Sequence, residues 1–182
     1  MKFLLTAINA KFIHSNPSIY SLRAGVGEKL QPYVELAEFT INESLESILE
    51  GIWKRQPKVI GFSCYIWNWK LIREILTELP KILPDTEIWL GGPEVTYDGP
   101  GLLSEFPQVT GIMVGEGEVT FREVLGQYVR EAESTGQSEQ QPEPDSIEQQ
   151  IERERLQESL WQSALDRSPV CVLPPVIRHP EN

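Results

Sequence analysis

Cysteine is scarce in this chain of 182 residues, which contains only Cys64 and Cys171. Two cysteines that lie far apart in the sequence indicate neither a disulfide framework nor a zinc site. They also exclude, within this chain, an iron–sulfur cluster that needs three or four thiolates. Histidine is equally rare, with only His14 and His179, so no general base is evident beside Ser63 or Cys64. The sequence therefore predicts no catalytic residue and no metal ligand.

Positive charge is also in short supply, since 16 Lys and Arg residues face 27 Asp and Glu residues and the net charge is −11. This acidity argues against a nucleic-acid backbone or an anionic membrane as a partner. No apolar run approaches the length of a membrane span. The apolar start "MKFLLTAINA" is too short for a signal peptide and is followed at once by Lys11. We expect a cytoplasmic protein.

What the chain does have is five short apolar runs, at residues 3–8, 34–39, 58–63, 87–92 and 111–116. The first, third, fourth and fifth runs are apolar at nearly every position, as is typical of strands buried on both faces. The second run alternates more and is predicted to be an edge strand.

Helical patterns fill the gaps between these runs, over residues 17–30, 44–56, 69–79 and 118–133. Asn16 is predicted to cap the first helix, Thr40 and Glu43 have the spacing of a capping box, and Asn68 is predicted to cap the third helix. Strands that alternate with helices favour an α/β fold with a parallel sheet. We predict a flavodoxin-like, Rossmann-type sheet of five parallel strands in the order 2-1-3-4-5, with helices on both faces.

This pattern covers residues 1–133, which we interpret as one ligand-binding domain. Residues 134–146 are acidic and rich in Ser, Gln and Pro, so we expect a flexible linker there. Residues 147–182 have apolar positions at helical spacing and then several prolines, which indicates an amphipathic helix and a proline-rich tail.

Glycine follows two neighbouring strands of the predicted sheet. Gly91, Gly92 and Pro93 leave the fourth strand, and Gly115 and Gly117 leave the fifth. Ligands of open parallel sheets bind at the carboxyl ends of the strands. Because glycine permits a positive φ and a close approach to the backbone, the two exits predict a flat or bulky ligand along this edge. A tight turn from strand to helix would explain the same glycines without a ligand.

Four stretches of the sequence, taken in order, resemble a known family. They are "NAKFIHSNPSIYSLRA" (9–24), "GFSCYIWN" (61–68), "GGPEVTY" (91–97) and "VGEGEVTF" (114–121). The resemblance covers about residues 1–130. The family is the N-terminal cobalamin (B12)-binding domain of B12-dependent radical S-adenosylmethionine (SAM) enzymes. That group includes the anaerobic magnesium-protoporphyrin IX monomethyl ester oxidative cyclases and related methyltransferases.

The resemblance implies that cobalamin binds at the carboxyl edge of the sheet. Ser63 would hydrogen-bond the dimethylbenzimidazole of the nucleotide tail, and Gly91 and Gly92 would line the slot for the tail. The start of the last helix near Glu118 would offer free amides to the phosphate. The cofactor-binding residues implied in this way are Asn9, His14, Ser63, Tyr65, Trp67, Gly91, Gly92, Pro93, Gly115, Glu116, Gly117 and Thr120.

The sequence departs from the family pattern at two points. The first loop has His14 but lacks the Asp and Gly of the Asp-x-His-x-x-Gly motif, so His14 is either a cobalt ligand or a loop histidine. The Cys-x-x-x-Cys-x-x-Cys motif of the radical domain is absent. SAM and a [4Fe-4S] cluster would therefore belong to a C-terminal radical SAM domain of a longer polypeptide, unless this domain acts alone.

The aromatic residues after the third strand have two interpretations. Tyr65 or Trp67 could lie against the corrin ring, or these rings could pack the following helix onto the sheet, as we expect for Trp69. The alternative function is a stand-alone flavodoxin-like ligand-binding or regulatory domain without cobalamin. A phosphoacceptor receiver is disfavoured, because no acidic pair follows the first strand and the third strand ends on Ser63 instead of aspartate.

Overall fold

Five parallel strands form one sheet in the order β2-β1-β3-β4-β5, which confirms the predicted topology. The computed structural model describes residues 1–11 and 15–134, so most of the predicted linker and all of the predicted tail lie outside the described residues. The strands are β1 (Phe3–Asn9), β2 (Val34–Thr40), β3 (Val59–Ser63), β4 (Glu87–Gly91) and β5 (Val109–Met113).

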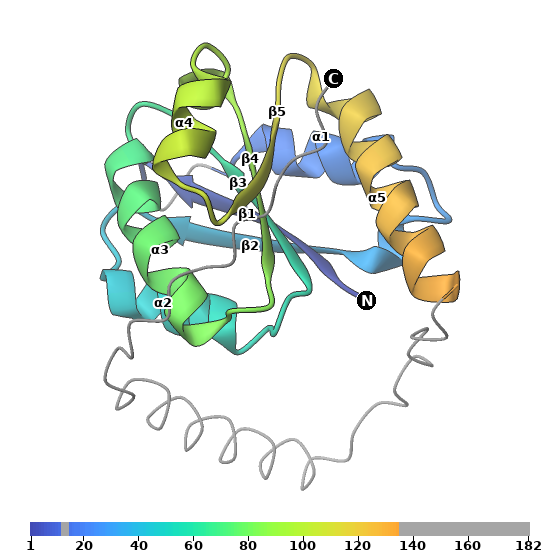
Figure 1. Cartoon of the computed structure of the whole chain (residues 1–182), viewed down its shortest axis with the longest axis horizontal. Coiled ribbons are helices and arrows are strands. Elements are labelled where there is room, and N and C mark those ends of the chain that lie inside the picture. The colour runs from blue at the N-terminus through green and yellow to red at the C-terminus, as the bar shows by residue number, and fades with distance from the viewer. Residues whose placement is uncertain (12–14, 135–182) are drawn as a thin grey trace, which may run out of the picture.

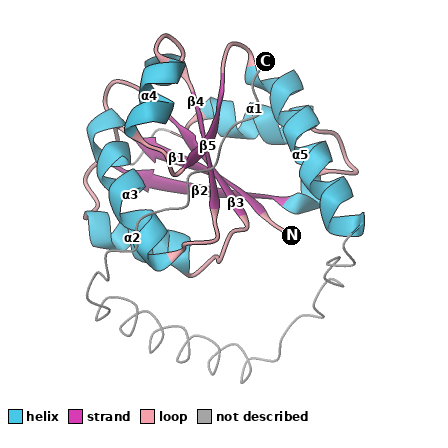
Figure 2. Ribbon diagram, viewed as in Figure 1, coloured by secondary structure: helices cyan, strands magenta, loops and turns pink. Residues whose placement is uncertain are grey.

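Helices cover both faces of the sheet. One face carries α1 (Pro17–Gly25) and α5 (Gly117–Ser134), and the other carries α2 (Leu45–Trp53), α3 (Trp69–Ile82) and α4 (Gly99–Glu105) (Figure 1). Two short 3₁₀ helices, η1 (Gln31–Tyr33) and η2 (Pro93–Val95), complete the described elements. Figure 2 shows the strands as a central layer between the two layers of helices.

Each face of the sheet has its own apolar core. On the first face, Phe3 packs edge-on against Phe121 of α5, with 5.0 Å between the ring centroids, and Ile19 of α1 is buried beside them. On the second face, Ile48 of α2 and Ile72 of α3 are fully buried over the sheet. Since full burial of such a side chain contributes roughly 1.5–3 kcal/mol, these two cores account for much of the stability of the fold.

The fifth strand differs from its prediction. β5 spans Val109–Met113 and lies at the edge of the sheet, with Gly111 and Ile112 only half-buried, so the prediction that the run 111–116 is buried on both faces is wrong. The strand also ends earlier than residue 116, because Val114 is exposed and Gly115 adopts a φ of +83°. A left-handed residue cannot continue a strand.

Two of the three predicted helix caps are different in the structure. Asn16 caps α1 as predicted, since its Oδ1 accepts a hydrogen bond from the backbone N of Ser18 at 3.0 Å. The cap of α2 is Ser44, not Thr40. Glu43 does accept from the backbone N of Thr40 at 2.7 Å, as in a capping box, but the helix begins only at Leu45.

Asn68 precedes α3, but its side chain does not cap the helix. It is fully buried, and its Nδ2 donates to the carbonyl oxygens of Ile8 in β1, at 3.0 Å, and Ser63 in β3, at 2.9 Å. Its Oδ1 accepts from the backbone N of Tyr65 at 2.8 Å. Asn68 therefore ties the carboxyl ends of β1 and β3 together and fixes the turn that leaves β3.

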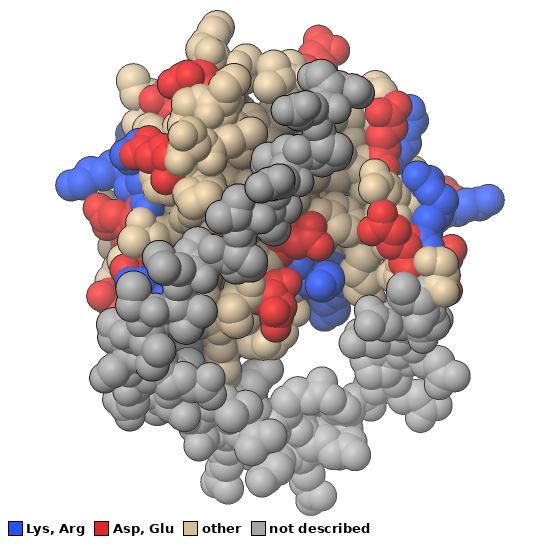
Figure 3. Space-filling model, in the orientation of Figure 1, with Lys and Arg blue, Asp and Glu red and all other residues tan. Residues whose placement is uncertain are grey.

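The charged side chains on the face seen in Figure 3 are mixed, with Lys and Arg beside Asp and Glu instead of gathered into a basic patch. Several of them form ion pairs, such as Lys54 with Glu50 at 2.9 Å and Lys81 with Glu78 at 2.8 Å. Among the described residues, no helix is long and apolar enough to span a membrane.

Candidate functional site

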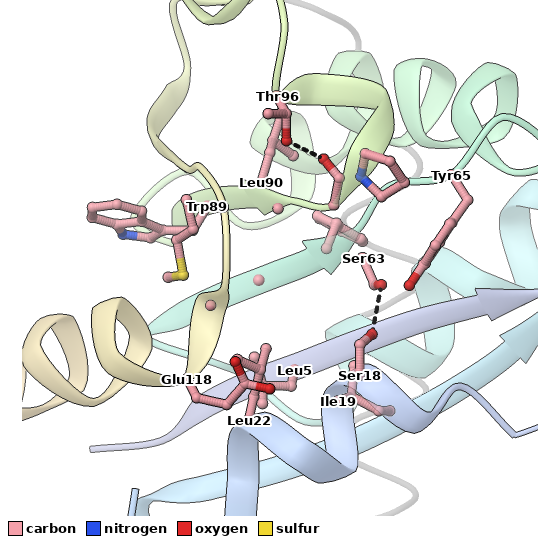
Figure 4. A pocket seen from close by; sticks show the side chains of 18 of the residues that line it. Leu5, Ser18, Ile19, Leu22, Ser63, Tyr65, Trp89, Leu90, Thr96 and Glu118 are labelled. Carbon is pink, nitrogen blue, oxygen red and sulfur yellow. Dashed lines mark hydrogen bonds between the residues drawn. The ribbon is translucent and has the colours of Figure 1, made fainter. Parts of the chain in front are cut away.

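A cavity of about 400 Å³ lies on the sheet face that α1 and α5 cover. Its size is within the range of pockets that bind small molecules and cofactors. The sheet supplies its floor, α1 supplies one wall, and the loops that leave β4 and β5 border its mouth (Figure 4). The lining residues from the sheet are Leu5, Gly61, Phe62, Ser63, Trp89, Leu90, Gly91 and Met113.

The floor is hollow because the sheet carries small residues there. Strand register places Ser63 beside Gly91, and Gly91 beside Met113, in one row across β3, β4 and β5. Side chains alternate along a strand, so Gly61 and Ser63 lie on the same face of β3. The apolar side chains of Trp89 and Met113 line the cavity next to the small residues Gly61, Ser63 and Gly91. The space above these small residues is therefore a narrow slot with apolar sides.

Gly91 and Gly92 are glycines for different reasons. A Cβ on Gly91 would lie 3.7 Å from the Cβ of Met113, an ordinary contact, and would occupy the floor of the slot. A Cβ on Gly92 would lie 2.4 Å from the carbonyl oxygen of Cys64, and Gly92 has a φ of +110°. The backbone that follows β3 therefore requires glycine at position 92, whether or not a ligand binds.

The loop after β5 carries the other predicted glycines. Gly115, at φ +83°, has nothing within 4 Å of the position a Cβ would take. A Cβ on Gly117 would lie 2.9 Å from Cδ2 of Leu22, because α5 starts close against α1. Both glycines line the cavity, whereas Glu116 and Thr120 do not.

A cluster of three hydrogen-bonded polar side chains, Asn16, Ser18 and Ser63, closes the slot on the side of α1. Ser18 and Ser63 face each other, with 3.1 Å between their Oγ atoms (Figure 4). The Nδ2 of Asn16 donates to Oγ of Ser63 at 3.2 Å, and the hydroxyl of Ser18 donates to Oδ1 of Asn16. Asn16 is only 7% exposed, so its hydrogen bonds to Ser18 and Ser63 are shielded from solvent.

Glu38 of β2 holds both ends of the first loop. Its Oε2 accepts from Nδ2 of Asn9 at 2.7 Å and from the backbone N of Asn16 at 3.2 Å, and its Oε1 accepts from the hydroxyl of Tyr20. Burial opposes the charge of Glu38, but these hydrogen bonds outweigh it and lower the pKa of the carboxyl group. Asn9 therefore lies beside the site without lining the cavity. His14 lies outside the described residues.

The aromatic residues after β3 separate into two roles. Tyr65 and Trp67 stack on each other, with 4.4 Å between centroids and an angle of 8° between the planes. Tyr65 lines the cavity, whereas Trp67 does not and is 46% exposed. Trp69 instead packs edge-on against Phe106 and under the guanidinium of Arg73, which confirms its predicted packing role.

Cys64 shows no sign of reactivity. Its thiol is fully buried, and this burial raises its pKa to about 12, so it stays protonated at neutral pH. Among residues 1–11 and 15–134, no group of three or more His, Cys, Asp or Glu side chains could hold a metal ion.

Sequence reasoning did not find several residues of the site. Seven of the twelve predicted residues line the cavity: Ser63, Tyr65, Gly91, Gly92, Pro93, Gly115 and Gly117. The walls contributed by Ser18, Ile19, Leu22, Thr96 and Tyr97 were missed. Glu118 also lines the mouth, where a hydrogen bond from Ser21, at 2.8 Å, lowers the pKa of its carboxyl group.

Apolar side chains are exposed around this same edge. Ile66 after β3 is 80% exposed, Tyr97 after β4 is 93% exposed, and Val114 after β5 is 56% exposed. They come from three successive loops at the carboxyl ends of neighbouring strands. An apolar rim around a slot is typical of a surface that a ligand or another domain covers.

The family model of the B12-binding domain matches residues 4–125. The cobalamin-dependent radical SAM methyltransferase TokK of Streptomyces tokunonensis is 37% identical over 71 residues, which are 38% of this chain and 10% of that protein. The 2-(S-pantetheinyl)-carbapenam-3-carboxylate methyltransferase of Streptantibioticus cattleyicolor is 36% identical over 84 residues, 46% of this chain and 12% of that protein.

A solved structure has the same fold. The cobalamin-dependent SAM radical enzyme OxsB, with aqua-cobalamin and SAM bound, superposes with a TM-score of 0.57 at 19% identity. The superposition covers 70% of this chain and 19% of the OxsB chain. The matched region is about a tenth of the length of the two curated relatives. This chain belongs to the B12-binding domain family, and its domain is similar to the B12 module of cobalamin-dependent radical SAM methyltransferases.

Proposed function

We propose that this chain binds cobalamin and is the cobalamin-binding module of a radical SAM enzyme. The observation that carries the proposal is the slot between α1 and the sheet, whose floor is left open by Gly61, Ser63 and Gly91. A planar heterocycle fits a slot with apolar sides, and the hydroxyl of Ser63 gives it one polar partner.

The nucleotide tail would enter this slot, with its base beside Ser63 and against Trp89. The phosphate would lie near Gly115 and Gly117, at the start of α5, because the first turn of a helix presents backbone amides that have no partner within the helix. Glu116 and Glu118 oppose the phosphate charge, so we expect the amides and not the side chains to hold it. Gly92 and Pro93 shape the mouth of the slot, and Thr120 borders the phosphate.

The corrin ring would then cover the carboxyl edge of the sheet. The stacked pair of Tyr65 and Trp67 would offer the exposed face of Trp67 to the ring, and Asn9, the last residue of β1, would lie beside it. A bound corrinoid would supply a cobalt centre for methyl transfer, while the residues of this chain hold and orient it. The relatives favour a methyltransferase over an oxidative cyclase. In either case, SAM and the [4Fe-4S] cluster would be held by a C-terminal radical SAM domain.

The test is an absorption spectrum of the purified chain after incubation with hydroxocobalamin and removal of unbound ligand by desalting. We expect the protein fraction to keep about one corrinoid per chain. A folded protein that retains none would overturn the proposal and would favour a flavodoxin-like domain that binds another ligand.

A further inference from the structure

The hydrogen bonds around Ser63 determine which way its hydroxyl hydrogen can point. This inference rests on the proposed binding of a corrinoid, and it concerns which lower bases the slot accepts. Asn16 is central to it, because this residue contacts both Ser63 and Ser18.

The orientation of the Asn16 amide follows from its partners. The backbone N–H of Ser18, 3.0 Å away, is always a donor, so the atom of Asn16 that faces it must be the acceptor Oδ1. The same Oδ1 accepts the hydroxyl of Ser18. The backbone N of Asn16 is in turn held by Glu38 at 3.2 Å, which fixes the residue in place. The Nδ2 of Asn16 must therefore point at Ser63.

Because Nδ2 carries only hydrogens, it can only donate, and Oγ of Ser63 accepts this bond at 3.2 Å. The single hydrogen of Ser63 must then point elsewhere. Its possible acceptors are Oγ of Ser18, at 3.1 Å, or an atom of a ligand in the cavity that Ser63 lines. A base in the slot that offers an acceptor atom can therefore take this hydrogen from Ser63, in place of Oγ of Ser18.

We propose that Asn16 is a positioning residue that makes Ser63 a donor, and that the slot consequently selects cobamides whose lower base offers an unprotonated ring nitrogen. Dimethylbenzimidazole has such a nitrogen when it does not ligate cobalt. A phenolic lower base has none. The slot should therefore prefer cobalamin over a cobamide with a p-cresol base.

The test measures the Kd of both cobamides by equilibrium dialysis, with the wild-type chain and the variants Ser63→Ala and Asn16→Asp. The carboxylate of the Asn16→Asp variant would still cap α1, but it would accept the hydrogen of Ser63 and so remove the donor from the slot. We expect each variant to bind cobalamin roughly two- to tenfold more weakly, the loss of one hydrogen bond. Both should bind the p-cresol cobamide nearly as well as the wild type does.

The double variant should show no further loss, since both changes remove the same hydrogen bond. Ser44→Ala is the matched control, because it removes the cap of a helix on the other face of the sheet and should leave both Kd values unchanged. Equal losses for both cobamides, or cobalamin bound by Asn16→Asp as tightly as by wild type, would overturn the inference. Wild type that binds no corrinoid would instead overturn the proposed function.

Discussion

Replacement of Gly91 by valine tests the slot with the least disturbance of the fold. A Cβ at this position would make only an ordinary contact, 3.7 Å from the Cβ of Met113, and the backbone of Gly91 is not left-handed. Replacement of a strand glycine commonly stabilises a protein by about 0.5–1 kcal/mol. The methyl groups of valine would, however, extend into the floor of a cavity of about 400 Å³. We expect a variant of near wild-type stability that does not retain cobalamin.

The matched control is the neighbouring substitution Gly92→Ala. Its Cβ would lie 2.4 Å from the carbonyl oxygen of Cys64, and alanine would be strained at a φ of +110°. To relieve the clash, the backbone around Cys64 must shift. This shift disturbs the hydrogen bond, 2.7 Å long, that the backbone N of Cys64 donates to the carbonyl oxygen of Gly91. Strain and the loss of this bond together should cost about 2–4 kcal/mol of stability.

Urea unfolding, followed by tryptophan fluorescence, measures the stability of both variants, and desalting after incubation with hydroxocobalamin measures retention. We expect the Gly91→Val variant to lose cobalamin binding and keep its urea midpoint. We expect the Gly92→Ala variant to have a lower urea midpoint than the wild type. Cobalamin retained at wild-type level by folded Gly91→Val would show that the tail does not lie on this floor. If the Gly92→Ala variant were as stable as the wild type, the claim that the backbone requires glycine at position 92 would be refuted.

Three further predictions concern residues around the slot. Glu38→Gln should lower stability at neutral pH. A carboxylate with a lowered pKa stabilises only while it is ionised, so the deficit should disappear as the pH falls through this pKa, below the ordinary 4.5. Urea midpoints across pH measure this, and a deficit that persists in acid contradicts it. In a Cys171→Ser background, Cys64 should react with iodoacetamide at pH 8 only after unfolding, because burial raises its pKa to about 12; rapid labelling of the folded chain would show that the thiol is accessible. Tyr128→Phe should cost about 1–3 kcal/mol, because the indole N–H of Trp89 loses its acceptor, 3.0 Å away. An unchanged urea midpoint would count against this bond.

The fold was predictable because a parallel sheet imposes a pattern on every strand. The central strands β1 and β3 are buried in the structure, and their apolar runs predicted them to within a residue or two. The prediction failed where burial is incomplete. β5 is an edge strand, and the apolar Val114 beyond it belongs to an exposed loop, so hydrophobicity alone did not mark where this strand ends.

The candidate site was predictable only at its carboxyl edge. Strand ends are recognisable, so Ser63 and the glycines after β4 and β5 could be assigned to one edge from the sequence. The wall from α1 was not predictable. Ile19 and Leu22 have the periodicity of any buried helix face, and sequence does not distinguish a side chain that lines a cavity from one that packs in the core. Asn16 could be predicted as a helix cap, but its bond to Ser63 depends on tertiary structure.

The glycines show why a sequence signal for a ligand remains ambiguous until the backbone is known. A Cβ on Gly61 would approach the ring of Phe3 to 3.2 Å, and one on Gly111 would lie 2.6 Å from the ring of Trp89, so the apolar core restricts both positions. Gly92 is required by the backbone that follows β3. Only Gly91 combines an ordinary backbone and tolerable contacts with a place on the cavity floor. Because the fold does not need glycine there, Gly91 is the glycine whose presence argues most directly for a ligand in the slot.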